Sequence, residues 1–305
     1  MNIKNLFPVG ARVCFVGDSI THTGYFIRYI HEYYRAEHSE RKVEFYNCGI
    51  AGGNLRNTID IYNEDIAIYE PTHIVLMIGV NDSRRHRLDN EPGAERYEKI
   101  FESYEKYQRN LEEFYGITKE RNVEFILCTP APYDEYQKAD SPCLRGGYAL
   151  MLGYAAYIKE FGFKNGIKVC DYHSAMTKAM QSGLLYSSDR VHPNRLGHLC
   201  MARTFLEFQG VDNFEALDFS LETEEWYTVT QKLRDVVTAE YFASPEYLKM
   251  SDTERFKTVK EKVDMIDNGQ LEMGDYVEGL MRRYLENKPH QSEYVNYLKN
   301  FIKNN

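Results

Sequence analysis

Three side chains that together can cleave an ester stand far apart in this sequence. Ser19 follows the first apolar run, and Asp189 and His192 lie about 170 residues later. A serine hydroxyl needs an adjacent base, a histidine can take its proton and return it to the leaving group, and a carboxylate fixes the histidine tautomer. Asp189 and His192 are three residues apart, so a single turn can hold the acid against the base. This spacing predicts a Ser-His-Asp hydrolase if the fold brings Ser19 to that turn.

The elements between these residues predict a fold that can do so. Short apolar runs typical of strands occur at residues 13–16, 43–46, 73–78, 123–128 and 167–170. Longer stretches typical of helices occur at residues 25–37, 55–69, 94–119, 148–163 and 195–208. The run at 73–78 is apolar on both faces, as in a central parallel strand, whereas 43–46 is more polar and suits an edge. This order predicts an α/β fold of three α/β/α layers around a doubly wound, five-stranded parallel sheet.

The candidate residues all follow predicted strands. Ser19 follows the first strand, Gly52 the second and Asn81 the third, and Asp189 and His192 follow the fifth. Ligands of open parallel sheets bind at the carboxyl ends of the strands. We therefore expect these five residues to lie along one edge of the sheet.

Four short motifs in this order resemble those of the GDSL, or SGNH, hydrolase family. They are Gly-Asp-Ser-Ile at 17–20, with Ile20 where the name-giving leucine would stand, then residues 47–54, Gly-Val-Asn-Asp at 79–82, and Asp-Arg-Val-His at 189–192. The resemblance covers residues 11–208. It implies a flavodoxin-like SGNH hydrolase fold and a serine esterase or acylhydrolase activity.

The resemblance also implies a role for each matched residue. Ser19 would be the nucleophile, His192 the base and Asp189 the residue that orients His192. The oxyanion hole would consist of the Ser19 backbone N–H, the Gly52 backbone N–H and the Asn81 side-chain amide. Gly-Asn follows Gly52 where Asp-Thr is frequent in the family, so Gly53 is the alternative N–H donor. No metal or organic cofactor is implied.

Each residue also has a structural interpretation when taken alone. Asp18 and Ser19 suit a helix N-cap, and Gly52 with Gly53 suits a turn. The other histidines that compete for the role of base are His22, His73, His86, His173 and His198. His22 lies close to Ser19 in sequence, and none of the others has a carboxylate at a comparable spacing in a loop that follows a strand. His192 is therefore the predicted base.

Two further groups of side chains are candidates for substrate contacts. The chain has 25 tyrosines, and those with a position suited to stacking on a sugar are Tyr133, Tyr136 and Tyr148. The arginines beside the third motif, which suit either an anionic substrate or a solvated loop, are Arg84, Arg85 and Arg87.

Composition excludes several classes of protein. The net charge of −9 disfavours nucleic-acid binding, which needs a basic face. The longest apolar run, residues 74–80, is far too short to cross a bilayer, and the N-terminus lacks the apolar region of a signal peptide. The six cysteines occur singly, without a CxxC pair or zinc-ligand spacing, which favours reduced thiols in a cytoplasmic protein.

The composition changes near Gly210. We expect residues 1–211 to form the catalytic domain and residues 212–305, which lack a convincing strand, to form a helical extension. This extension is a candidate for assembling homo-oligomers or for covering the pocket.

The predicted function is a cytoplasmic carboxylic-ester hydrolase that removes short acyl groups, acetyl above all, from a carbohydrate or other small substrate. A lysophospholipase or thioesterase is the alternative with the same chemistry. A non-catalytic binding protein on the same fold is the alternative of a different class, although such a protein would be expected to lack Ser19, Asn81 or His192.

Overall fold

The computed structural model describes most of the chain up to residue 212. The described residues are 5–85, 94–138, 143–181, 183, 185–187 and 189–212, with a few isolated positions between 254 and 270. The strands are β1 Arg12–Gly17, β2 Glu44–Gly49, β3 His73–Met77, β4 Glu124–Cys128 and β5 Lys168–Cys170. The α-helices are α1 Ser19–Thr23, α2 Tyr25–Glu37, α3 Leu55–Asp60, α4 Tyr62–Asp65, α6 Glu95–Glu120, α7 Gly147–Asn165, α8 Tyr172–Met180 and α9 Arg195–Phe208, and two 3-10 helices are η1 Ser39–Arg41 and η2 Ala67–Tyr69.

The five strands form one parallel sheet in the order β2-β1-β3-β4-β5. Every residue of β3 is buried, as expected for the central strand, and β2 is an edge strand. Gly17 pairs in register with Gly49 of β2 and Met77 of β3, so these three strands end at the same level. The loops that follow them consequently start side by side at the carboxyl edge of the sheet. The predicted fold class is confirmed.

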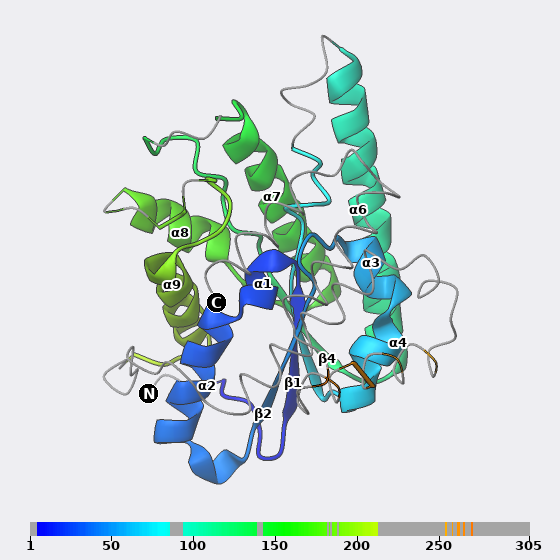
Figure 1. The fold of residues 1–305 in the computed structure, drawn as a ribbon, viewed down its shortest axis with the longest axis vertical. Helices are drawn as coiled ribbons and strands as arrows, with labels where there is room; N and C mark the ends of the chain where they lie inside the picture. The colour runs from blue at the N-terminus through cyan, green and yellow to red at the C-terminus, as the bar shows by residue number, and fades with distance from the viewer. Residues whose placement is uncertain are drawn as a thin grey trace.

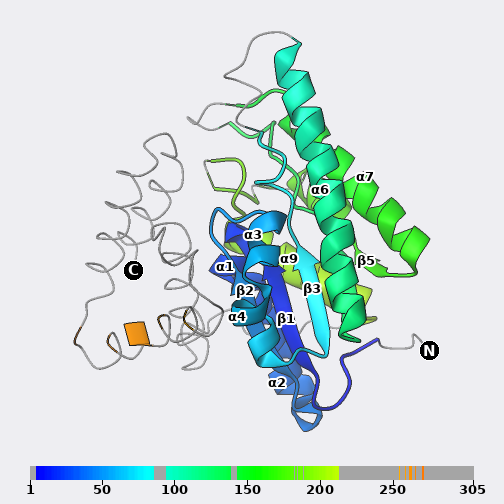
Figure 2. The same ribbon diagram turned by 90° about the vertical axis from the view of Figure 1, so that its right-hand side faces the viewer.

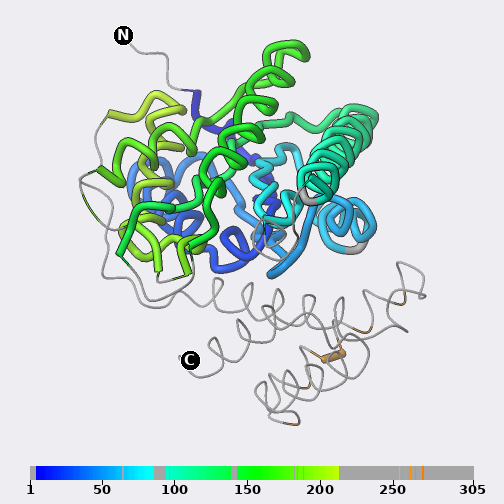
Figure 3. The backbone as a smooth tube through the Cα atoms, turned by 90° about the horizontal axis from the view of Figure 1, so that it is seen from above, coloured from blue at the N-terminus to red at the C-terminus, as the bar shows by residue number. Residues whose placement is uncertain are grey.

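Helices cover both faces of the sheet and complete the three layers (Figure 1). α2 and α9 pack against each other on one face, and α3, α6 and α7 cover the other. Figure 2 shows α6 and α7 side by side in front of the sheet, and from above α6 and α9 lie at opposite flanks (Figure 3). α8, which follows β5, contacts both α7 and α9 and so connects the helices of the two faces.

Local side-chain caps explain where the structure differs from the sequence pattern. The stretch 55–69 is divided into α3, α4 and η2, and α3 begins with a capping box between Asn54 and Asn57. The short helices α1 and α8 were not predicted. Their N-caps, Asp18 and Asp171, accept hydrogen bonds from the backbone N–H groups of Ile20 and Ser174. Such caps stabilise helices too short to show an apolar period.

Two glycines allow α1 to lie directly against the sheet. A Cβ atom on Gly17 would stand 2.4 Å from the carbonyl oxygen of Met77, and one on Gly49 would stand 2.2 Å from the backbone nitrogen of His22. Neither backbone atom can move without shifting its whole element. Ser19, the first residue of α1, is therefore placed by contacts that require glycine.

The predicted domain boundary at residue 211 lies next to the end of the described residues and stays a prediction. Val211 is buried, and the N–H of Asn5 donates to the carbonyl of Gln209, which ties the start of the described chain to its end. Most of the predicted extension, 212–305, lies outside the described residues, so its helical nature stays a prediction. Among the described helices, none combines the length and apolar character needed to cross a membrane.

Candidate active site

The structure brings Ser19, His192 and Asp189 together at the carboxyl edge of the sheet. The Ser19 Oγ lies 2.7 Å from Nε2 of His192, and Nδ1 of His192 lies 2.5 Å from Oδ2 of Asp189. Ser19 is 8 % exposed, while the His192 side chain is 28 % exposed. The hydroxyl is thus held against the imidazole, whose second nitrogen faces a carboxylate.

The turn that carries the acid and the base is stabilised by the acid itself. Oδ1 of Asp189 accepts the backbone N–H groups of Val191 and His192 and the hydroxyl of Ser187. The Ser187 backbone N–H donates to the carbonyl of His192, and the single hydroxyl proton of Ser187 is shared between that carbonyl, at 2.8 Å, and Oδ1 of Asp189, at 3.0 Å. Burial opposes ionisation of Asp189, but the hydrogen bonds and charge of His192 outweigh it and lower the pKa of this carboxyl. Asp189 is therefore a carboxylate at neutral pH.

Arg190 fastens this turn to the loop after β4. Its backbone is left-handed, with φ of 67°, and its buried guanidinium donates to the carbonyls of Asp134 and Gln137 at 3.3 and 2.7 Å. The N–H of Asp134 donates in return to the Arg190 carbonyl, and the Gln137 amide donates to the Ser187 carbonyl. Arg190 was not predicted as part of the site, because nothing in the sequence indicates which loop its side chain reaches.

Asp18 has the structural role that its position suggests. One carboxylate oxygen caps α1, and the other is buried without a hydrogen-bond partner in the described part of the chain. Burial raises the pKa of Asp18 to about 6, against the smaller opposing effects of the Ile20 N–H and the charges of His192 and Arg85. A second acidic group therefore lies near the His192 imidazole.

The loops after β2 and β3 meet through Asn81. Gly52 is exposed and left-handed, with φ of 73°. The Gly53 N–H already donates to the carbonyl of Ile50, and the Asn81 side-chain amide donates to the Gly53 carbonyl at 2.8 Å. Because the Gly53 N–H is occupied, these contacts favour Gly52 as the backbone donor. The Asn81 NH₂ group has a second hydrogen, which this bond leaves available for an oxyanion.

Asp82, the residue after Asn81, binds the end of the loop that follows β2. Both of its carboxylate oxygens accept the Leu55 N–H, at 3.1 and 3.3 Å. Burial raises the pKa of Asp82 to about 7, and the neighbouring charge of Asp18 raises it further, whereas the Leu55 N–H and Arg84 act in the opposite direction. Asn81 and Asp82 thus form a clamp on residues 53–55. Asp82 belongs to the motif at 79–82, but its contact with residue 55 was not predicted from the sequence.

The other histidines have different partners. His73 lies at the amino end of β3, 3.3 Å from a Glu124 carboxylate, and burial lowers its pKa. Burial also lowers the pKa of His173, and it lowers that of His198 to about 3, which is far from the neutral range that suits a general base. His22 is buried in α1, and its carbonyl accepts the Asn47 amide. His86 lies outside the described residues.

The candidate tyrosines and arginines separate by exposure. Tyr133 is buried, Tyr148 is half-buried, and Tyr136 is 76 % exposed on the loop that Arg190 holds. Arg85 donates to the carbonyl of Val80, and the backbone of Arg84 is left-handed, so both are parts of the loop after β3. Arg87 lies outside the described residues.

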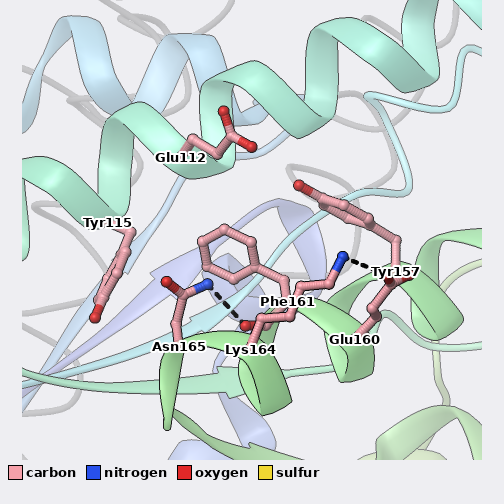
Figure 4. Close-up of a pocket in the computed structure, with 7 residues that line it drawn as sticks. All are labelled: Glu112, Tyr115, Tyr157, Glu160, Phe161, Lys164 and Asn165. Carbon is pink, nitrogen blue, oxygen red and sulfur yellow. Dashed lines mark hydrogen bonds and ion pairs between the residues drawn. The ribbon is translucent and has the colours of Figure 1, made fainter.

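A groove with apolar and charged walls lies away from these residues. It has a volume of about 320 Å³ and runs between α6 and α7, where Tyr115 and Phe161 form apolar walls and Lys164 pairs with Glu160 (Figure 4). A second groove continues from it past Glu124 and Lys168, at the amino ends of β4 and β5. Ser19 follows the carboxyl end of β1, so these grooves lie toward the opposite edge of the sheet. In the described residues, no three His, Cys, Asp or Glu side chains gather closely enough to hold a metal ion.

Comparison with known proteins decides the family. A family model described as the GDSL-like lipase/acylhydrolase family matches residues 15–199, which is more than half of the chain. The chain belongs to this family. The matched range of this GDSL-like protein includes the end of β1, the strands β2 to β5 and all of Ser19, Gly52, Asn81, Asp189 and His192.

The GDSL-like protein is also similar to characterised relatives. It is 27 % identical over 223 residues to an acetylxylan esterase of Geobacillus stearothermophilus, a match that covers 67 % of this chain and 95 % of the relative. A solved structure of a gut microbial diltiazem-metabolizing enzyme matches with a TM-score of 0.61 and 25 % identity, over 67 % of this chain and 48 % of that one. The crystal structure of an acetylxylan esterase from G. stearothermophilus matches with a TM-score of 0.57 and 23 % identity, over 70 % of this chain and 98 % of that one. This last likeness shows the shared fold.

Proposed function

We propose that this protein is a serine-dependent carboxylic-ester hydrolase that removes acetyl groups from a carbohydrate or another small alcohol. The observation that carries the proposal is the Ser19–His192–Asp189 chain of contacts, with 2.7 and 2.5 Å between successive partners. These distances lie within hydrogen-bond reach, which is the geometric requirement for a nucleophile and its base.

The geometry supports a two-step mechanism. His192 takes the Ser19 proton as Oγ attacks the ester carbonyl carbon, and Asp189 holds Nδ1 of the imidazole so that Nε2 is free to accept that proton. The Ser19 and Gly52 N–H groups and the Asn81 amide stabilise the oxyanion, and such donors contribute about 3 kcal/mol each. His192 then protonates the departing alcohol. Water, activated in the same way, hydrolyses the acyl-enzyme and restores Ser19.

Support for an acetyl ester comes from the relatives. The acetylxylan esterase named above matches this chain over 95 % of its own length. Polar contacts of Asn81, Asp82 and Arg190 also join the loops around Ser19 to one another. The preference for a short acyl group therefore rests on the likeness to this esterase.

Hydrolysis of esters of different chain length tests this proposal. We expect the purified protein to hydrolyse p-nitrophenyl acetate and to lose at least about tenfold in kcat/KM with the octanoate, because one mispositioned methylene group alone costs about 1–3 kcal/mol. A Ser19→Ala control should lose roughly 10³-fold or more in kcat. A preference for octanoyl and longer esters would favour the lysophospholipase or thioesterase alternative. No hydrolysis of any ester would favour the binding-protein alternative.

We further infer that the protein works in a reducing compartment such as the cytoplasm. All six cysteines are free thiols, and Cys14, Cys48, Cys128 and Cys170 are buried where they pack as small apolar side chains. Protein unfolded without reductant should therefore titrate six thiols, and fewer would contradict the inference.

A further inference from the structure

The loop after β4 presents an exposed aromatic ring beside the catalytic turn. Tyr136 is 76 % exposed, although its loop neighbour Asp134 is buried. An exposed tyrosine ring beside hydrogen-bonded loop residues suits a contact surface, since tyrosine offers a large, rigid area at a low cost in conformational entropy.

This loop is fixed to the residues that carry out the chemistry. Arg190, between Asp189 and His192, donates to the carbonyls of Asp134 and Gln137, and Gln137 donates back to the Ser187 carbonyl at 2.9 Å. Tyr136 lies between these two anchored positions. Its own backbone N–H donates to Oδ1 of Asp134 at 3.0 Å, and the N–H of Gln137 donates to the same oxygen. The position of Tyr136 is thus set relative to the Asp189–His192 turn.

The Tyr136 ring has support on one side. Its centroid lies 6.1 Å from that of Tyr148, with 63° between the planes, and Tyr148 in turn lies 5.3 Å from the ring of His173. The contact between the two tyrosines is edge-to-face, an arrangement that aromatic pairs prefer, and the contact with His173 is tilted. Tyr148 comes from α7 and His173 from α8, so the two rings behind Tyr136 belong to helices of the fold.

From this arrangement we infer that Tyr136 is a sugar-binding residue, on which a pyranose ring of the alcohol part of the substrate stacks while its ester lies at Ser19. This inference rests on the proposed function. A pyranose has C–H faces surrounded by hydroxyls, and Tyr136 matches it with one exposed ring between the half-buried polar residues Glu135 and Gln137. An acyl chain would instead require a continuous aliphatic surface. The substrate class is therefore an acetylated oligosaccharide.

Three variants test this role. Tyr136→Ala removes the ring, Tyr136→Phe keeps the ring without its hydroxyl, and Phe163→Ala removes another exposed ring, 89 % exposed near the far end of α7. The measured quantity is the ratio of kcat/KM for an acetylated xylo-oligosaccharide to kcat/KM for p-nitrophenyl acetate. We expect Tyr136→Ala to lower this ratio about threefold to tenfold through KM for the oligosaccharide, as the energies of single aromatic contacts imply. Tyr136→Phe and Phe163→Ala should keep the wild-type ratio.

An unchanged ratio in Tyr136→Ala, or an equal loss in Tyr136→Phe, would overturn stacking on the ring. Calorimetric titration of the Ser19→Ala protein with the same oligosaccharide separates this result from a failure of the proposed function. If the wild-type protein hydrolyses no ester, the hydrolase proposal fails. The sugar contact is then judged by affinity alone: about threefold to tenfold weaker binding after adding Tyr136→Ala supports it, and equal binding overturns it.

Discussion

At the scale of single residues, the two carboxylate oxygens of Asp189 have separate roles. Oδ1 accepts the N–H groups of Val191 and His192 and so shapes the turn, whereas Oδ2 faces Nδ1 of His192. One side chain thereby builds the turn and fixes the imidazole tautomer. Ser19 depends on a different carboxylate, since Asp18 caps the helix that Ser19 begins.

Asp189→Asn separates these two roles. An asparagine oxygen can still accept the backbone N–H groups, but its NH₂ would face Nδ1 of His192 and force the imidazole proton onto Nε2. Nε2 of His192 would then carry a hydrogen and could not accept the Ser19 proton. We expect kcat for p-nitrophenyl acetate to fall roughly 10³-fold to 10⁴-fold, as in other triads, with a melting temperature close to that of the wild type. Activity within tenfold of the wild type would contradict the role of Asp189.

At the scale of elements, the site depends on how closely α1 lies against β2. The alternation of strands and helices in the sequence predicted the five parallel strands and the edge at which Ser19 and His192 meet. It did not predict α1 or α8, which are held by single caps at Asp18 and Asp171. Nor could it predict the Arg190 and Asp82 contacts, because these join loops whose distance is set only by the finished sheet.

Gly49→Ala tests the contact between β2 and α1. Its Cβ would stand 2.2 Å from the His22 backbone nitrogen, so α1 must shift or the protein must unfold more readily. We expect a loss of about 1–3 kcal/mol in the free energy of unfolding, together with lower esterase activity. Gly116→Ala, on α6, is the matched control, because a Cβ atom at Gly116 would have no atom within 4 Å. This substitution should raise the free energy of unfolding by about 0.5–1 kcal/mol. Equal effects of the two substitutions would contradict this packing.

Asp82→Asn tests the buried clamp through the pH dependence of stability. The folded pKa of Asp82 is raised from 3.8 to about 7, so the folded state binds the extra proton over this range and the stability due to Asp82 falls as pH rises through it. The asparagine does not titrate and can still accept the Leu55 N–H. We expect the variant to gain stability relative to the wild type between about pH 4 and pH 7, by at most about 4 kcal/mol.

Denaturant titrations of both proteins across this range measure that difference. Asp18, whose pKa is raised to about 6, adds the same sign of slope, and His198, whose pKa is lowered to about 3, adds the opposite one. Both groups are present in the two proteins, so the difference between them isolates most of the Asp82 effect. A difference that stays flat or shrinks with rising pH would show that the Asp82 carboxylate is not buried in this way.

At the scale of the whole molecule, the two ends of the described range 5–212 lie together. The Asn5–Gln209 hydrogen bond joins its two ends, and the acetylxylan esterase relative is matched over 95 % of its own length by 67 % of this chain. Residues 212–305 remain the proposed extension, and most of them lie outside the described residues. The hydrogen bonds that join Ser19, His192 and Asp189 all lie before residue 212.

A chain of residues 1–211 tests this division. We expect it to unfold in one cooperative transition and to hydrolyse p-nitrophenyl acetate with a kcat within about tenfold of the full chain, because every described contact of the triad lies within it. Light scattering of both chains shows whether residues 212–305 assemble oligomers, as proposed. Failure of the shorter chain to fold would contradict the proposed boundary. The same number of subunits per particle in both chains would contradict the role of residues 212–305 in assembly.

The central claim is that Ser19 is an activated nucleophile, and covalent labelling tests it most directly. The native protein is treated with a fluorophosphonate and the modified residue is located by peptide mass spectrometry. The account predicts one adduct, on Ser19, that is absent from Ser19→Ala and much slower to form in His192→Ala. No adduct on the wild-type protein, or an adduct that persists in Ser19→Ala, would contradict it.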